Sequence, residues 1–202
     1  MKTVIIDLGC SNLKSLINAL DYIGCDYLVS SNAEVILNAD RLILPGVGAF
    51  GSAMKRIDDL SIRNTILSAV NDAKTPILGI CLGMQLLSQA GYENGFHEGL
   101  KFLNGDTRLM VPGSLRYKVP NYGWHSLRIS KKGSLLFQGI SESDTFYFVH
   151  SYHYIGENIS TTFSYGQNFA ASVESDNIYG VQFHPEKSRS AGIRVLKNFI
   201  GI

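Results

Sequence analysis

The sequence predicts an α/β fold in which helices cover both faces of a mixed, mostly parallel sheet. The first half of the chain alternates short apolar, β-branched runs with segments whose apolar residues recur at helical spacing. From about residue 101 to residue 183, Gly, Asn and Ser turns separate strand-like runs, which indicates partly antiparallel pairing. With 202 residues and 45% hydrophobic content, we expect a single three-layer domain over residues 1–202.

The first predicted strand covers residues 3–8, which are mostly apolar and β-branched. A helix should follow, because apolar residues then recur every three to four positions, at Leu13, Leu16, Ile17, Leu20 and Ile23. Asn12 is placed to cap the start of this helix, and Gly24 is placed to end it.

Further strands and helices follow the same logic. Residues 41–44 form a second buried strand, a helical region extends to about Asp72, and residues 76–80 form a third strand. In the second half, residues 146–149 and 178–183 are strand-like. An amphipathic helix closes the chain, with its apolar face at Ile193, Leu196, Phe199 and Ile200.

Charge, cysteine usage and the N-terminus argue against several classes of protein. A net charge of +1 without long basic runs gives no electrostatic surface for nucleic acid or a membrane. Cys10, Cys25 and Cys81 contain no C-x-x-C pair, so neither a disulfide framework nor a cysteine zinc site is expected. His150 and His153 stand three apart on an extended stretch and should face opposite sides, which argues against a shared metal. Without a signal peptide or membrane-length apolar segment, a cytoplasmic location is expected.

Cys81 is the strongest candidate for a catalytic nucleophile. It stands between Gly79 and Gly83, after an apolar strand-like run and before a helix-like one. This is the pattern of a nucleophile elbow with sulfur in place of a serine oxygen, and glycines are needed because a sharp strand-to-helix turn leaves no room for neighbouring Cβ atoms. At a helix N-terminus the dipole and free N–H groups favour the thiolate.

His184 and Glu186 complete a plausible catalytic triad. They follow Cys81 by about a hundred residues and supply a base and a carboxylate to orient that base. An activated thiol requires this combination, so the three residues together predict nucleophilic catalysis.

The glycine-rich stretch at residues 46–51 has two possible uses. It matches G-x-G-x-x-G, but a dinucleotide fingerprint needs an acidic residue at the end of the next strand, where Cys81 stands. The alternative is an oxyanion hole, in which Val47 and Leu82 donate backbone N–H groups to a developing negative charge. Gln85, one helical turn after Cys81, is placed to face the same pocket.

Five stretches resemble the class I, triad-type glutamine amidotransferases, and within them the glutaminase subunits of imidazole glycerol phosphate synthase. The matching stretches are residues 7–12 (DLGCSN), 44–50 (LPGVGAF), 79–87 (GICLGMQLL), 147–152 (YFVHSY) and 180–188 (GVQFHPEKS). Together with the closing helix they span nearly the whole chain. The resemblance implies a flavodoxin-like, three-layer fold.

The resemblance also implies a reaction and a binding site. Cys81 would attack the side-chain carbonyl of L-glutamine, His184 would pass the proton to the leaving ammonia, and Glu186 would orient the imidazole. Glutamate would leave after hydrolysis of a thioester, with no cofactor or metal. The glutamine-binding residues implied by similarity are Gly48, Gln85, Glu93, Ser151 and Tyr152, with Glu93 a partner for the α-ammonium group.

A partner subunit is implied as well. Nothing remains in this chain to bind an acceptor, and free ammonia would be mostly protonated in water, so a heterodimer with a cyclase (β/α)₈ barrel in histidine biosynthesis is expected. Asn12 and Lys187 match positions on the partner-facing side, and Trp124 is expected there too. Where the family usually has Pro-His-Met-Gly-Trp-Asn, residues 120–125 are PNYGWH, and Cys10 replaces a small residue or proline.

Three alternatives remain open at this point. The altered segment around Trp124 admits a paralogous glutaminase subunit that supplies ammonia for bacterial surface sugars. A cysteine hydrolase or peptidase-like protein of similar fold also carries a cysteine elbow. A non-catalytic scaffolding subunit is the third, which the intact Cys81, His184 and Glu186 argue against.

Overall fold

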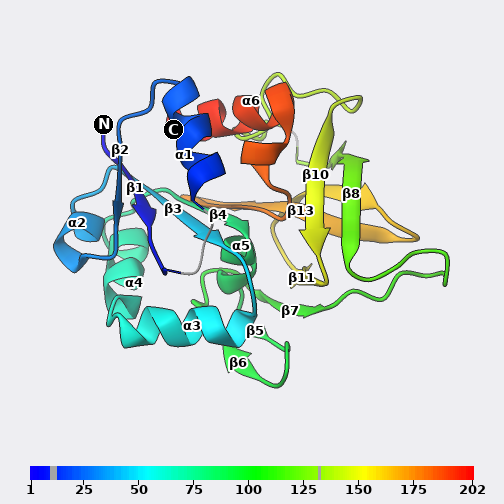
Figure 1. Ribbon diagram of the computed structural model, residues 1–202, viewed down its shortest axis with the longest axis horizontal. Helices are drawn as coiled ribbons and strands as arrows, with labels where there is room; N and C mark the ends of the chain where they lie inside the picture. Colours follow the sequence, from blue (N-terminus) through cyan, green and yellow to red (C-terminus); the bar gives the residue numbers. More distant parts are fainter. Residues whose placement is uncertain (10–12, 132) are drawn as a thin grey trace.

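A mixed sheet of eight strands forms the centre of the computed structural model, which describes residues 1–9, 13–131 and 133–202 (Figure 1). In spatial order its strands are β2 (Tyr27–Ser30), β1 (Thr3–Ile6), β3 (Arg41–Gly46), β4 (Ile77–Cys81), β14 (Ile178–Val181), β13 (Asn168–Ser175), β12 (Ile159–Ser164) and β9 (Arg128–Ile129). Neighbours from β2 to β14 are parallel, and those from β14 to β9 are antiparallel. The predicted mixed, mostly parallel sheet is confirmed.

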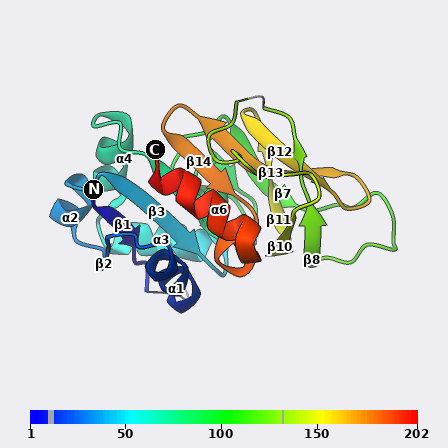
Figure 2. The same ribbon diagram turned by 90° about the horizontal axis from the view of Figure 1, so that it is seen from above.

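Helices cover both faces of the parallel half (Figures 1 and 2). One layer contains α1 (Lys14–Tyr22) and α6 (Arg189–Ile200). The other contains α2 (Ala33–Leu37), α3 (Phe50–Asp59), α4 (Arg63–Asn71) and α5 (Leu82–Leu86). The helical region expected up to about Asp72 comprises two helices, α3 and α4, and Ser61 between them has a φ of 56°.

Alternation along the first strand explains the three layers. Val4 and Ile6 pack into the core that includes α3 and α4, whereas Ile5 packs into the core shared with α1 and α6. All three side chains are fully buried. Because successive residues of a strand point to opposite faces, and burial of each such side chain contributes roughly 1.5–3 kcal/mol, this short run fixes both layers.

The C-terminus of α1 follows the expectation from its sequence. Gly24 has a φ of 69°, its N–H donates to the carbonyl of Asp21 at 3.0 Å, and the N–H of Cys25 donates to the carbonyl of Leu20 at 3.0 Å. This pair of bonds is the Schellman motif, which favours glycine at the left-handed position. The predicted N-cap, Asn12, lies outside the described residues.

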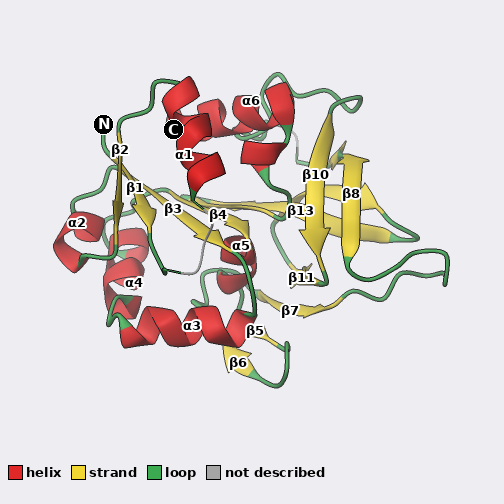
Figure 3. Cartoon of the chain, in the orientation of Figure 1, coloured by secondary structure: helices red, strands yellow, loops and turns green. Residues whose placement is uncertain are grey.

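Two smaller sheets extend the molecule beside the antiparallel half (Figure 3). In one, β10 (Thr145–His150) pairs with β8 (Asn121–Ser126). The other has the order β11 (Tyr152–Gly156), β7 (Gly105–Leu109), β5 (Ala90–Gly91) and β6 (His97–Glu98). Only Ser151 separates β10 from β11, and this turn reaches the end of β4 where the site lies.

The strand predicted over residues 178–183 ends earlier than expected. Its ladder stops at Val181, and the N–H of His184 then donates to the carbonyl of Tyr147 on β10 at 2.9 Å. A short 3₁₀ turn, η1 (Pro185–Lys187), follows and leads into α6. This departure from the sheet brings His184 to the carboxyl end of β4.

Candidate active site

Cys81 occupies a strained turn between β4 and α5. Its backbone has φ 54° and ψ −109°, a conformation that a non-glycine residue adopts only when the surrounding structure enforces it. A Cβ atom on Gly83 would lie 1.7 Å from the carbonyl oxygen of Leu44, and one on Gly79 would lie 2.6 Å from the carbonyl oxygen of Gly83. The predicted elbow geometry, with glycines required by close backbone approach, is confirmed.

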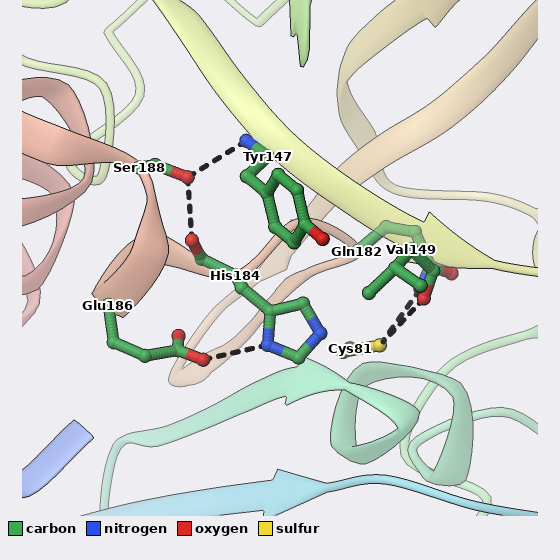
Figure 4. A network of polar contacts seen from close by, with 7 residues as sticks. All are labelled: Cys81, Tyr147, Val149, Gln182, His184, Glu186 and Ser188. Carbon is green, nitrogen blue, oxygen red and sulfur yellow. Dashed lines mark hydrogen bonds and ion pairs between the residues drawn. The ribbon is translucent and has the colours of Figure 1, made fainter. Parts of the chain in front are cut away.

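The side chains of Cys81, His184 and Glu186 form one chain of contacts. Figure 4 shows the imidazole of His184 between the carboxylate of Glu186 and the sulfur of Cys81. Nδ1 of His184 lies 2.7 Å from Oε1 of Glu186, and the other side of the imidazole faces the sulfur of Cys81. The hydroxyl of Ser188 donates to the carbonyl of His184 at 2.6 Å and accepts the N–H of Tyr147 at 3.0 Å, which holds the turn against β10.

The environment of His184 favours its protonated form. Burial opposes a charge there, but the hydrogen bonds and the charges of Cys81 and Glu186 outweigh burial and raise the pKa of His184 to about 10. The imidazole is therefore protonated near neutral pH. A thiolate beside an imidazolium is the reactive form of a cysteine nucleophile.

A cavity of about 330 Å³ opens beside Cys81. Its lining comprises Val47, Gly48, Cys81, Leu82, Gln85, Glu93, Val149, His150, Ser151, Tyr152 and His184. The volume suits a small ligand. The structure thus brings the predicted oxyanion residues and all the predicted glutamine-binding residues to one cavity, together with the nucleophile and the histidine.

Two of these lining residues have defined roles in the backbone around the cavity. Gly48 has a φ of 96°, a value that favours glycine, in the turn between β3 and α3. Oε2 of Glu93 accepts the N–H of Phe50, the first residue of α3, at 2.8 Å. This carboxylate therefore satisfies one of the free N–H groups at the helix N-terminus while it lines the cavity.

Sequence reasoning missed two buried polar residues of the site, Gln182 and His150. Nε2 of Gln182 lies 3.8 Å from the Cys81 sulfur, and Nδ1 of His150 lies 2.8 Å from the carbonyl oxygen of Tyr152. Burial lowers the pKa of His150 to about 4, so it is neutral at physiological pH. The only sequence signal for either residue is that a polar side chain stands within an otherwise apolar, strand-like run.

The predicted partner-facing residues lie at the surface where the structure describes them. Trp124 is 40% exposed, and the guanidinium of Arg189 stacks over its ring at 4.6 Å. The ammonium of Lys187 lies 6.0 Å from the ring centre of Tyr147, which contacts Trp124 edge-to-face. The third predicted residue, Asn12, falls outside the described part of the chain, as does Cys10.

The altered segment around Trp124 is only partly at the surface. Tyr122 is 72% exposed, but Asn121 is fully buried and His125 is half-buried. Nε2 of His125 lies 2.8 Å from Oδ1 of Asn121, because both side chains point inward from β8. The histidine and asparagine that differ from the family pattern therefore form an internal pair, and the exposed change is at Tyr122.

His150 and His153 were predicted to face opposite sides of one extended strand and so not to share a metal ion. The assumption that they share one extended strand was wrong, because Ser151 separates β10 from β11 and the two residues lie on different strands. Over the described ranges, no group of three or more His, Cys, Asp or Glu side chains could hold a metal ion. Nor does any described helix combine the length and apolarity needed to cross a membrane.

Comparisons with known proteins agree with this geometry. The family model for glutamine amidotransferase class-I matches residues 4–202. The chain is 44% identical to the imidazole glycerol phosphate synthase subunit HisH of Aquifex aeolicus, over 98% of this chain and 96% of that protein. It is 46% identical to HisH of Methanothermobacter thermautotrophicus, over 98% and 97%. The structure of PurLQS from Thermotoga maritima superposes with a TM-score of 0.72 at 17% identity, covering 99% of this chain and 97% of that one.

Proposed function

Because the chain belongs to the class-I glutamine amidotransferase family, we propose that it is the glutaminase subunit of an imidazole glycerol phosphate synthase. It hydrolyses L-glutamine to glutamate and ammonia. The ammonia passes to a synthase subunit that makes imidazole glycerol phosphate and AICAR in histidine biosynthesis. The observation that carries this proposal is the strained Cys81 at the edge of a small cavity, beside a His184 that Glu186 holds.

The proposed reaction follows from the protonated state of His184. The Cys81 thiolate attacks the side-chain carbonyl of glutamine, and the imidazolium gives its proton to the departing nitrogen, which leaves as ammonia. The thioester that remains is attacked by water, with neutral His184 accepting a proton, and glutamate leaves as the sulfur is restored. Glu186 holds Nδ1 of the imidazole throughout, so that the other nitrogen faces the sulfur.

The other lining residues are proposed to bind the substrate and its transition state. The N–H of Leu82 lies at the N-terminus of α5, and with the N–H of Val47 it would form the oxyanion hole. The carboxylate of Glu93 would attract the α-ammonium group of glutamine. Gly48, Gln85, Ser151 and Tyr152 would enclose the rest of the molecule.

A cyclase (β/α)₈ barrel is the proposed partner, and residues 1–202 act as one glutaminase domain in the heterodimer. The relatives with 44% and 46% identity are named as subunits, which supports a two-chain enzyme. The proposed docking face includes Trp124, Lys187 and Asn12. A groove of about 710 Å³ between α1 and α6 reaches Glu186 and carries the cationic side chains Arg189, Arg194 and Lys197. This groove would complement an acidic surface on the partner.

The test uses the chain together with its barrel partner. Wild type should release glutamate from glutamine, and Cys81→Ala should lose this activity while still binding the partner, because alanine fits the elbow. A glutamine analogue with an electrophilic group should modify Cys81 and leave Cys25, which lies beside Thr3 at 3.5 Å, unmodified. Substantial turnover by Cys81→Ala, or modification of Cys25 instead, would refute the proposal.

A further inference from the structure

Two buried chains of hydrogen bonds meet at the carbonyl oxygen of Tyr152. Nε2 of Gln85 donates to it at 2.9 Å, and Nδ1 of His150 lies 2.8 Å from it. A carbonyl oxygen only accepts hydrogen bonds, so both partners must present an N–H. The orientation of the Gln85 amide and the tautomer of His150 are therefore fixed by the backbone.

The first chain leads from this carbonyl to the nucleophile. The same nitrogen of Gln85 donates to Oε1 of Gln182 at 3.0 Å, so Gln182 must turn its NH₂ group the other way. That group lies 3.8 Å from the sulfur of Cys81 (Figure 4). Gln182 is fully buried and Gln85 is 5% exposed, so little solvent competes for these bonds.

The second chain anchors the same carbonyl from the other side. Nε2 of His150 accepts from Nδ2 of Asn121 at 3.2 Å, since Nδ1 of His150 carries the proton. Oδ1 of Asn121 then accepts from Nε2 of His125 at 2.8 Å. These three residues hold the Tyr152 carbonyl in place, so they position the first chain rather than contact the sulfur.

A backbone carbonyl close to the sulfur would destabilise a thiolate unless a donor such as the side-chain N–H of Gln182 were also present. Besides His184 and Gln182, the carbonyl oxygen of Val149 lies 3.9 Å from Sγ of Cys81 and can accept the thiol proton. When the proton moves from Sγ to His184, this carbonyl faces a thiolate and repels it. The N–H of Gln182 opposes that repulsion, because a hydrogen bond to a charged acceptor is stronger than one between neutral groups.

We propose that Gln182 is a further catalytic residue: its side-chain N–H stabilises the Cys81 thiolate, and Gln85 and the Tyr152 carbonyl keep that N–H, and not the amide oxygen, directed at the sulfur. The proposal rests on the proposed function, because it takes Cys81 as the nucleophile. Without Gln182 the thiol beside the imidazolium would release its proton only at higher pH, and fewer molecules would hold a thiolate near neutrality.

The test compares Gln182→Met, which keeps the length of the side chain but has no donor, with wild type in the complex with the barrel partner. Alkylation of Cys81 by iodoacetamide is followed by mass spectrometry as a function of pH. We expect the pH at which the alkylation rate rises to increase by about one unit in the variant. At pH values below this rise, alkylation of the variant should be about tenfold slower than that of wild type. The kcat for glutamine should fall by a similar factor with a smaller change in KM.

Two further variants control for folding. Gln138→Met makes the same change at an exposed glutamine and should leave the alkylation profile unchanged. If Gln182→Met does not fold, as judged by circular dichroism, Gln182→Glu replaces it; a carboxylate beside the sulfur should move the profile further in the same direction. An unchanged profile in a folded Gln182 variant would overturn the proposal. Lack of glutamine hydrolysis by wild type would instead overturn the proposed function, since the alkylation profile is measured independently.

Discussion

Protonation of the buried His150 should destabilise the protein in mild acid. Burial lowers the pKa of His150 to about 4; the nearby His153, His125 and His184 add to this effect, and the bond to the Tyr152 carbonyl opposes it. The ordinary pKa is 6.5, so the unfolded state binds more protons between these values and stability falls as the pH falls through them. The full difference between these two pKa values corresponds to roughly 3 kcal/mol in the free energy of unfolding. About 2 kcal/mol of it is lost between about pH 7 and about pH 4.5.

The assay is urea unfolding followed by the fluorescence of Trp124, the single tryptophan. His150→Gln is the matched variant, because it keeps a donor and an acceptor but does not titrate in this range. Wild type should lose about 2 kcal/mol more than the variant between about pH 7 and about pH 4.5. His184 does not interfere: its pKa is raised to about 10, so its contribution is fully present below about pH 6.5 and is lost only as the pH rises toward 10. Equal losses in both proteins would refute the reasoning.

Three further sets of substitutions test the elbow, the Asn121–His125 pair and the groove between α1 and α6. Gly83→Ala should destabilise the protein by roughly 3 kcal/mol or more in urea unfolding, because its Cβ would overlap a backbone carbonyl. Gly201→Ala, whose Cβ would make ordinary contacts at 3.4 and 3.5 Å, should change stability by less than about 1 kcal/mol, and similar values for the two glycines would contradict the close packing of the elbow. Asn121→His and His125→Asn should each destabilise the protein, and the double exchange should recover about 1 kcal/mol relative to their sum; strict additivity would mean that the two side chains do not interact. Arg194→Glu should weaken binding to the barrel partner about tenfold or more in calorimetry, and an unchanged affinity would remove the groove from the docking face.

Much of the parallel half and the elbow could be predicted from sequence, because their patterns are local. The apolar run before Cys81 and the glycines around it specify a strand, a turn and a helix within a few residues. His184 and Glu186 could be paired with Cys81 because a thiol nucleophile needs such groups, although the distance between them along the chain gives no geometry. These two residues were predicted from the chemical requirements of the nucleophile and not from a local sequence pattern.

The rest depends on contacts between distant segments, which local pattern does not encode. Gln182 was predicted only as part of a strand, yet its partners Gln85 and Cys81 precede it by 97 and 101 residues. The inward direction of Asn121 and His125 follows from the pairing of β8 with β10, and a shift of one residue in that pairing would have turned both outward. The register of a long-range strand pair is not visible in either strand alone.

The most direct test of the central claim is transfer of the amide nitrogen of glutamine within the assembled pair. The chain and the cyclase barrel of the same organism are supplied with amide-¹⁵N glutamine, the ribonucleotide substrate of the barrel and an excess of unlabelled ammonium. The account predicts ¹⁵N in the imidazole glycerol phosphate that forms, and loss of this label with Cys81→Ala. Unlabelled product, formed only from the added ammonium, would contradict the assignment of this chain as the glutaminase subunit of that synthase.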